Sequence, residues 1–216
     1  MKIPAPCPLC GAPLTDRYYT TAKPENYFRC PDCTLIHLDP SGRLSLPEER
    51  ARYDLHRNDS GDEGYVQFLR RLADPMIESI RPGARGLDFG CGPAPVLSDL
   101  LTSAGFPCAA YDPLFCPDVS LLSRRYDFVT CSEVVEHVHE PALLFPLLQR
   151  LLMPGGVLGV MTRFYGDDSG FATWWYRRDP THVCFYAEPT MRWIADHYGW
   201  SVSFPRSDVA LFRSPG

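Results

Sequence analysis

The chain has 216 residues, 45% of them hydrophobic, which suffices for one full domain and a small additional module. A formal charge of −5, from 21 basic and 26 acidic side chains, argues against a strong general nucleic-acid binder. No apolar run reaches membrane-spanning length and the first residues lack a signal pattern, so we expect a soluble, cytoplasmic protein with no membrane partner.

The first forty residues carry two cysteine pairs. Cys7 and Cys10 are two residues apart, as are Cys30 and Cys33, and nineteen residues separate the pairs. This spacing indicates a tetrahedral structural zinc site, because each pair can direct both sulfurs onto one ion. Disulfides would need an oxidising compartment, for which nothing in the sequence argues. Because so short a segment lacks a core of its own, we expect residues 1–40 to fold as a zinc ribbon only with metal.

Aromatic residues lie between the two cysteine pairs, and two roles stay open for them. Tyr18, Tyr19 and Tyr27 could stack on nucleic-acid bases or on a substrate, whereas aromatic residues of a ribbon hairpin more often form its own small core. We favour a structural or substrate-covering role for the ribbon. The other five cysteines are interpreted as reduced packing residues: Cys91, Cys108, Cys116, Cys131 and Cys184.

Residues 41–81 are predicted to be a helical linker. Ser45 precedes a helix start that has Glu48 three residues later, as in a capping box. A second helix is predicted from Gly64 over residues 64–73, and Pro75 should interrupt it.

The segment 86–95, Gly-Leu-Asp-Phe-Gly-Cys-Gly-Pro-Ala-Pro, is the most informative part of the sequence. A short apolar strand ends in Asp88, the tight turn Gly90-Cys91-Gly92 follows, and a helix begins near Pro95. Glycines let a ligand touch backbone N–H groups at the positive end of the helix. An ordinary strand-to-helix turn is the alternative. We predict a site for an adenosine-containing cofactor.

Two features narrow the choice of cofactor. Pro95 replaces the third glycine of a dinucleotide fingerprint, and proline has no N–H for a pyrophosphate. Asp112, twenty residues after Gly92, ends the next strand and can accept hydrogen bonds from both ribose hydroxyls. This pattern resembles the class I S-adenosylmethionine (SAM)-dependent methyltransferases. The resemblance implies SAM as cofactor, contacted by Asp88, Gly90, Cys91, Gly92, Asp112, Pro113, Asp118 and Ser132.

The resemblance extends over residues 82–216, for which it implies a Rossmann-like, doubly wound α/β sheet. A strand over 126–131, a helix over 141–152, a Met-Pro-Gly-Gly turn and a strand over 157–161 are similar to the family's fourth and fifth strands. A helix over 189–199 and strands over 200–204 and 208–212 would form the terminal part. Leading helices commonly cover the cofactor site in this family, so Tyr53, His56 and Tyr65 of the linker could touch a ligand.

One departure from the family concerns the third strand. Only thirteen residues separate Asp112 from Tyr126, too few for the usual helix and strand, so that edge of the sheet is either missing or replaced by an extended segment. Asp118 is the nearby candidate for the acid that contacts adenine in the family.

The segment Glu133-Val-Val-Glu136-His137 supplies a second group of candidate residues. If it is helical, its i, i+3 and i+4 positions share a face, and the distant His182 could add a fourth ligand for a divalent ion such as Mg²⁺ or Mn²⁺. Similar sets hold an ion in the small-RNA 3′-terminal 2′-O-methyltransferases and the quinone-pathway O-methyltransferases. Alternatively, the two glutamates cap a helix or bind arginine.

Residues 164–186 are rich in aromatic side chains and should face the substrate. Trp174, Trp175 and Phe185 could wall the site or form the core of a lid. His182 is suited to accept a proton from the nucleophile, and His137 is a second catalytic candidate; His182 cannot serve fully as both base and ligand.

The resemblance implies transfer of a methyl group to oxygen, nitrogen or carbon of an unidentified acceptor. A small molecule is favoured, and RNA or protein substrates are possible. The alternative is a non-catalytic SAM-fold module whose zinc ribbon docks protein or RNA.

Overall fold

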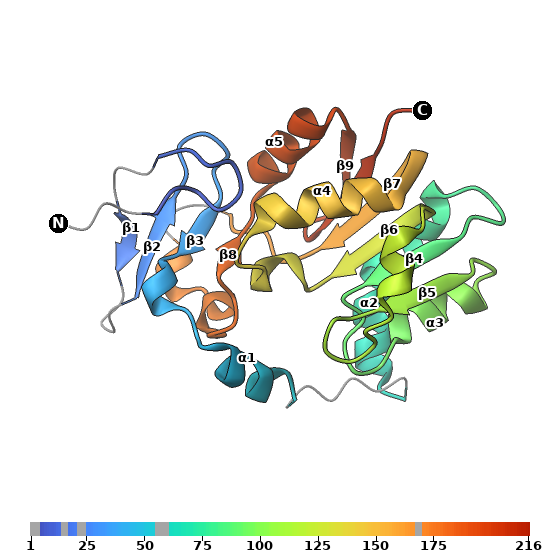
Figure 1. Cartoon of the computed structure of the whole chain (residues 1–216), viewed down its shortest axis with the longest axis horizontal. Coiled ribbons are helices and arrows are strands. Elements are labelled where there is room, and N and C mark those ends of the chain that lie inside the picture. Colours follow the sequence, from blue (N-terminus) through green and yellow to red (C-terminus); the bar gives the residue numbers. More distant parts are fainter. Residues whose placement is uncertain (1–4, 14–16, 21–24, 55–60, 167–169) are drawn as a thin grey trace.

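The computed structural model describes residues 5–13, 17–20, 25–54, 61–166 and 170–216 and contains two β-sheets (Figure 1). Four strands of the larger sheet run in the order β5-β4-β6-β7 and are parallel. Next to them, β10 pairs antiparallel with β7, and β9 pairs antiparallel with β10. This arrangement confirms the predicted Rossmann-like α/β fold. The strands are β4 (Gly86–Phe89), β5 (Cys108–Tyr111), β6 (Tyr126–Ser132), β7 (Leu152–Met161), β9 (Ser201–Arg206) and β10 (Val209–Arg213).

Helices cover both faces of the larger sheet. Alternate strand residues point to opposite faces, so Phe128 packs with α2 and α3 while its neighbour Val129 packs with α4 and α5. Gly199, in the left-handed conformation, ends α5 as expected. The helices are α2 (Glu63–Ser79), α3 (Val96–Ser103), α4 (Pro141–Leu151) and α5 (Glu188–Tyr198).

Two predicted element boundaries were wrong. Pro75 does not interrupt α2, because Leu72, Ala73 and Met76 are fully buried around it and this packing outweighs one lost backbone hydrogen bond. Strand β7 already begins at Leu152, since the Met-Pro-Gly-Gly segment continues beside β6 through a register shift.

The edge of the larger sheet lacks the family's third strand within the described residues. After β5 the chain forms only the short 3₁₀ helix η2 (Val119–Ser123) before entering β6. Asp118 caps η2 by accepting a hydrogen bond from the Ser120 N–H at 3.0 Å. The shortened connection predicted from the sequence is therefore confirmed, and β5 is the edge strand.

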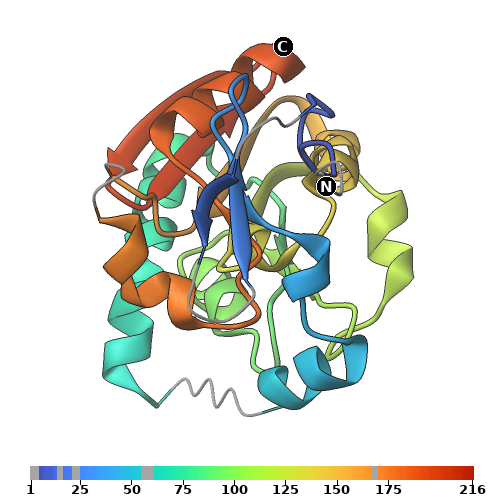
Figure 2. The ribbon, with the colours of Figure 1, turned by 90° about the vertical axis from the view of Figure 1, so that its left-hand side faces the viewer.

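The smaller sheet has the order β1-β2-β3-β8 and joins distant parts of the chain (Figure 2). Strand β8 comes from the aromatic-rich segment 164–186, so the three strands from the first forty residues share a sheet with the methyltransferase-like region. They also share its core: Tyr27 lies 5.3 Å from Phe171 and 5.9 Å from Phe185, ring centre to ring centre. Tyr27 thus has a structural role, in a core that the ribbon shares with the aromatic-rich segment rather than in one of the ribbon's own. The strands are β1 (Arg17–Thr20), β2 (Asn26–Arg29), β3 (Ile36–Leu38) and β8 (Cys184–Phe185).

The linker forms η1 (Pro40–Gly42) and then α1 (Leu46–Tyr53), which begins with the predicted capping box of Ser45 and Glu48. The Glu49 side chain of α1 lies 2.7 Å from the imidazole of His139. His56 lies outside the described residues. In the part of the chain that the structure describes, no helix combines the length and apolar character needed to cross a membrane.

Candidate active site and cysteine cluster

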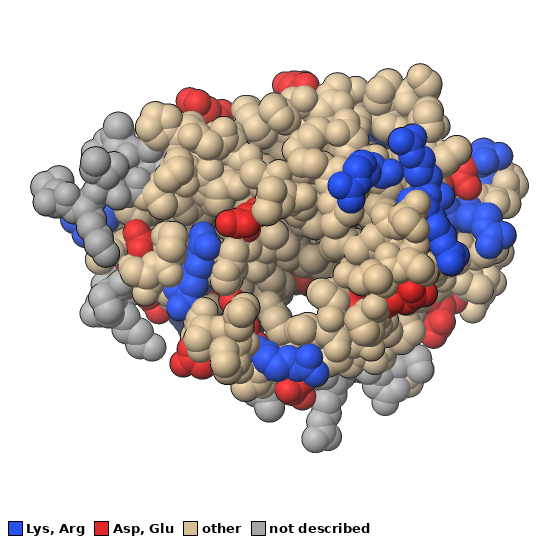
Figure 3. All heavy atoms as spheres, viewed as in Figure 1, with Lys and Arg blue, Asp and Glu red and all other residues tan. Residues whose placement is uncertain are grey.

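A cavity of about 860 Å³ opens at the carboxyl ends of β4, β5 and β6. Figure 3 shows the surface hollowed between α1 and the body of the molecule. Basic side chains on this face gather elsewhere, around a groove at the amino ends of the strands that is lined by Arg81, Arg85, Arg124 and Arg125. Of the predicted site residues, the cavity is lined by Gly90, Gly92, Asp112, Pro113, Ser132, Glu133, His137 and His182, with Tyr53 and Tyr65 from the linker.

The turn after β4 requires glycine at two positions. Gly90 has φ +80°, and a Cβ atom there would lie 2.3 Å from a methyl group of Val134. Gly92 has φ +67°, which also favours glycine. The Gly90 N–H donates to the carbonyl of Tyr111 at 2.7 Å, so β5 fixes the turn. Together these constraints bring the turn backbone to the cavity wall.

Asp112 is held by three backbone N–H groups. Its Oδ1 accepts from Leu114 at 2.8 Å and from Phe115 at 3.1 Å, and its Oδ2 accepts from Gly92 at 3.1 Å. A carboxylate offers about four acceptor positions, so one position on Oδ2 remains for a ligand. The three amides thus leave fewer acceptor positions than the two hydroxyl contacts expected from the sequence would need.

Three residues predicted to contact the cofactor are not among those that line the cavity: Asp88, Cys91 and Asp118. Asp88 is 2% exposed and accepts a hydrogen bond from the Thr130 hydroxyl at 2.8 Å, and burial raises the pKa of its carboxyl to about 7. The structure thus gives Asp88 a place beneath the turn. Cys91 is buried, and Asp118 caps η2.

Two glutamates of the predicted metal set converge on one tyrosine. The Tyr176 hydroxyl contacts Oε2 of Glu133 at 3.2 Å, and it also contacts Oε1 of Glu136. Burial, with the nearby Glu136 as the second cause, raises the pKa of Glu133 to about 9. Burial also raises the pKa of Glu136. One oxygen of each carboxyl group, Glu133 Oε1 and Glu136 Oε2, is buried and has no hydrogen-bond partner within the described part of the chain.

His137 and His182 stand edge to face, with ring centres 4.7 Å apart. The Nδ1 atom of His182 lies 2.7 Å from the Tyr176 carbonyl, and that of His137 lies 3.2 Å from the Thr181 carbonyl. Because a carbonyl only accepts, each Nδ1 carries the proton and each Nε2 carries the lone pair. Burial lowers the pKa of His182, although Glu136 opposes this effect.

The structure brings three of the four predicted divalent-metal ligands together. Ligand atoms of Glu136, His137 and His182 all lie within 4.8 Å of one another. Glu133 is not part of this set. The predicted i, i+3, i+4 helical face does not form, because Glu133 adopts φ +51° and the short 3₁₀ helix η3 (Val135–His137) begins only after it.

Sequence reasoning did not single out Tyr176, which joins the two carboxyl groups. It lies in the short 3₁₀ helix η5 (Trp175–Arg178), which follows the 3₁₀ helix η4 (Phe171–Thr173) in the aromatic-rich segment. The only sequence feature that pointed to Tyr176 was its position in that segment. Trp175 is 62% exposed and lines the cavity, whereas Trp174 and Phe185 pack with the smaller sheet's core.

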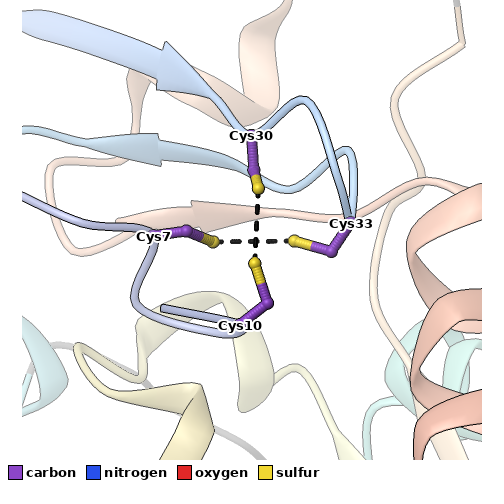
Figure 4. Close-up of side chains that lie close together, drawn as sticks. All are labelled: Cys7, Cys10, Cys30 and Cys33. Carbon is purple, nitrogen blue, oxygen red and sulfur yellow. Dashed lines mark hydrogen bonds between the residues drawn. The ribbon is translucent and has the colours of Figure 1, made fainter. Parts of the chain in front are cut away.

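The four cysteines of the predicted zinc site point toward one centre (Figure 4). Sulfur–sulfur distances are 3.5 Å for Cys7 and Cys33 and 3.4 Å for Cys10 and Cys30. Four sulfurs at the usual zinc–sulfur distance of about 2.3 Å would stand about 3.8 Å apart in a tetrahedron. A disulfide would need a separation of about 2 Å. The arrangement therefore fits a tetrahedral ion better than two disulfides.

Both cysteine loops have the same backbone form. The N–H of Gly11 donates to the Cys7 carbonyl at 2.9 Å, and the N–H of Thr34 donates to the Cys30 carbonyl at 3.1 Å. Gly11 and Thr34 both have positive φ, of +75° and +62°. The Cys33 thiol lowers the pKa of Cys7 to about 5 by donating a hydrogen bond. Ionising the remaining thiols in so small a space requires a cation.

Comparison with known proteins places the chain in a family. Residues 55–203, more than half of the chain, match the family described as methyltransferase domain. The chain belongs to this family of methyltransferase domains.

Curated relatives match shorter regions. Ubiquinone biosynthesis O-methyltransferase of Xanthomonas campestris is 30% identical over 107 residues, which cover 38% of this chain and 44% of the relative. The enzyme of the same name from Sodalis glossinidius is 34% identical over 87 residues, which cover 39% of this chain and 34% of the relative. The chain thus spans less than half the length of these curated relatives.

Solved structures share the fold. The 1,6-didemethyltoxoflavin-N1-methyltransferase of Burkholderia thailandensis, solved with S-adenosylhomocysteine, has a TM-score of 0.55 at 13% identity and covers 94% of this chain and 100% of its own. An O-methyltransferase family protein from the same organism has a TM-score of 0.53 at 12% identity, covering 78% of this chain and 63% of its own.

Proposed function

We propose that this chain transfers the methyl group of SAM to oxygen, nitrogen or carbon of a small-molecule acceptor. The observation that carries the proposal is one continuous cavity, which joins the Gly90–Gly92 turn and Asp112 to Tyr176 and His182. Methyl transfer is an in-line displacement, so catalysis depends mainly on holding acceptor and sulfonium together. In this proposal residues 82–216 form the catalytic region, residues 41–81 cover the cofactor and residues 1–40 form the ribbon.

The cofactor half of the cavity has groups of two kinds. Oδ2 of Asp112 would accept a hydrogen bond from one ribose hydroxyl, and its position is fixed by the Gly92 N–H. The glycine turn would let the cofactor approach the backbone. A side chain at Gly90 would clash with Val134 and so disturb the turn. Pro113 and Ser132 line the same cavity and are proposed contacts.

For the acceptor half, we propose a divalent ion held by Glu136, His137 and His182. The support is the convergence of these three side chains: the buried Glu136 Oε2, which has no hydrogen-bond partner among the residues that the structure describes, lies beside two imidazoles whose Nε2 atoms carry lone pairs. Two nitrogens and one carboxylate suit Mn²⁺, Co²⁺, Fe²⁺ or Zn²⁺ better than Mg²⁺, which prefers oxygen. Such an ion would polarise an acceptor hydroxyl. The residues themselves would orient that hydroxyl toward the cofactor.

Chelation separates this proposal from its alternative, in which His182 acts as a base without metal. With the ion, activity should be lost in chelator and return with Mn²⁺ or Co²⁺, and His182→Ala should bind less metal. Without it, activity should survive chelation and follow one ionisation below the usual histidine pKa of about 6.5, which His182→Ala removes. Activity that survives chelation would refute the divalent site.

We further propose that Cys7, Cys10, Cys30 and Cys33 bind one structural zinc ion. The four sulfurs converge, with separations of 3.5 Å for Cys7 and Cys33 and 3.4 Å for Cys10 and Cys30, and this convergence supports the proposal. The ribbon contacts the rest of the chain through Thr34 and through the pairing of β3 with β8. A separate docking module would not need these contacts.

The acceptor class can be tested without knowing the acceptor. Labelled SAM should transfer its methyl group to components of a small-molecule cell extract, and transfer should be weaker into purified RNA or protein fractions. The curated relatives named ubiquinone biosynthesis O-methyltransferases favour a hydroxyl acceptor. A protein that binds SAM yet labels none of these fractions would support the alternative, a non-catalytic module.

A further inference from the structure

The smaller sheet is hydrogen-bonded directly to the segment that carries His182. Strand β3 pairs with β8, and the N–H of Leu38 donates to the Val183 carbonyl at 2.9 Å. The N–H of Val183 in turn donates to the Glu136 carbonyl at 2.8 Å. The residue that follows His182 is therefore fixed between the smaller sheet and the segment that carries Glu136 and His137.

The second cysteine loop, which ends at Thr34, contacts residues that precede and follow β8 in the sequence. Thr34 has φ +62°, which is strained for a β-branched residue and persists only where surrounding contacts impose it. Its hydroxyl lies 2.9 Å from that of Thr190, and its carbonyl accepts a hydrogen bond from the Tyr165 hydroxyl. These contacts tie the loop to the methyltransferase fold.

The Arg177 side chain contacts both the aromatic-rich segment and the ribbon. Its guanidinium lies 5.1 Å from the ring centre of Tyr19 and 5.5 Å from that of Tyr27. The same group donates to the carbonyls of Phe171 at 3.2 Å and Ala172 at 2.7 Å. Arg177 is absent from the cavity lining, although its neighbour Tyr176 belongs to it.

We propose that the sheet formed by β1, β2, β3 and β8 is a structural support that the acceptor half of the cavity requires. It positions Tyr176 and His182 against Glu136 and His137, and Arg177 is a positioning residue in this assembly. The inference rests on the proposed function for the identity of that half. Loosening the ribbon should therefore disturb the acceptor half while the cofactor half, built on β4 and β5 of the other sheet, keeps its ligand affinity.

Three variants of the full chain test this proposal by hydrogen–deuterium exchange and calorimetry. Arg177→Met removes the cation and its donors, and Arg177→Lys keeps the cation. Arg192→Met is the matched control, because Arg192 also lies over an aromatic ring, Phe204, at 4.8 Å but on α5. Peptides covering residues 176–186 should exchange about tenfold faster in Arg177→Met, nearer the native rate in Arg177→Lys, and unchanged in Arg192→Met.

The affinity for S-adenosylhomocysteine should stay within about twofold of the native value in all three variants, because the cofactor half is undisturbed. Unchanged exchange of residues 176–186 in Arg177→Met would overturn the proposal. An equal loss of S-adenosylhomocysteine affinity and exchange protection would also overturn it, because it would indicate general destabilisation. If the native chain does not bind S-adenosylhomocysteine, the proposed function fails, and the exchange comparison still decides whether the ribbon holds this segment.

Discussion

Replacing Asp112 with asparagine should weaken SAM binding while leaving the shape of the side chain unchanged. Its Oδ1 accepts from two loop amides, its Oδ2 accepts from the Gly92 N–H, and Asp112 lines the cavity. If the asparagine oxygen keeps the loop amides, its NH₂ group meets the Gly92 N–H and cannot accept from a ribose hydroxyl. Losing a hydrogen bond to a charged acceptor costs about 1.5–3 kcal/mol, a factor of about 10–150 in Kd.

Isothermal titration with SAM measures this loss, and Asp118→Asn is the matched control. That substitution removes the same charge from a carboxylate that caps η2 and is not among the residues lining the cavity. The control should bind within about twofold of the native chain. Thermal unfolding of each variant establishes that the loop at Leu114 and Phe115 remains folded. Unchanged affinity in Asp112→Asn, or an equal loss in Asp118→Asn, would refute the assignment of Asp112.

Three further predictions concern the metal, the turn and the ribbon. The native chain should carry one zinc by metal analysis and Cys33→Ser should lose it, whereas Cys108→Ser should keep it; a zinc-free native protein would contradict the ribbon assignment. Gly90→Ala should abolish SAM binding by calorimetry, since its Cβ would lie 2.3 Å from Val134, and native-like affinity would show that the turn is not needed. Burial lowers the pKa of His37 from 6.5 to about 4, so the folded state loses stability relative to the unfolded state as pH falls below about 6.5. The free energy of unfolding of His37→Phe, measured in urea, should therefore rise by about 2 kcal/mol relative to that of the native chain between pH 7 and pH 5. A difference that stays constant over this pH range would contradict the prediction.

Local sequence signals predicted the cofactor side well. The strand, glycine turn and helix at Gly90 follow from short-range backbone rules, and Asp112 follows from its position at the next strand end. The missing third strand could be recognised because thirteen residues cannot hold a helix and a strand. These features depend on neighbours in the sequence.

The acceptor side could be predicted only in part, because it depends on contacts between distant segments. Placing Glu133, Glu136 and His137 on one helical face assumed regular geometry, whereas Glu133 takes a left-handed conformation at the end of β6. Tyr176 gains its importance only where the fold brings it to both carboxyl groups. The pairing of β3 with β8 joins residues almost 150 positions apart, and no local periodicity indicates it.

A crystal structure with S-adenosylhomocysteine tests the central claim most directly. The account predicts that the ligand lies in the cavity of about 860 Å³, with a ribose hydroxyl on Oδ2 of Asp112 and its sulfur directed toward Glu133 and His182. Ligand found instead in the groove lined by Arg85 and Arg124, or no ligand at saturating concentration, would contradict it.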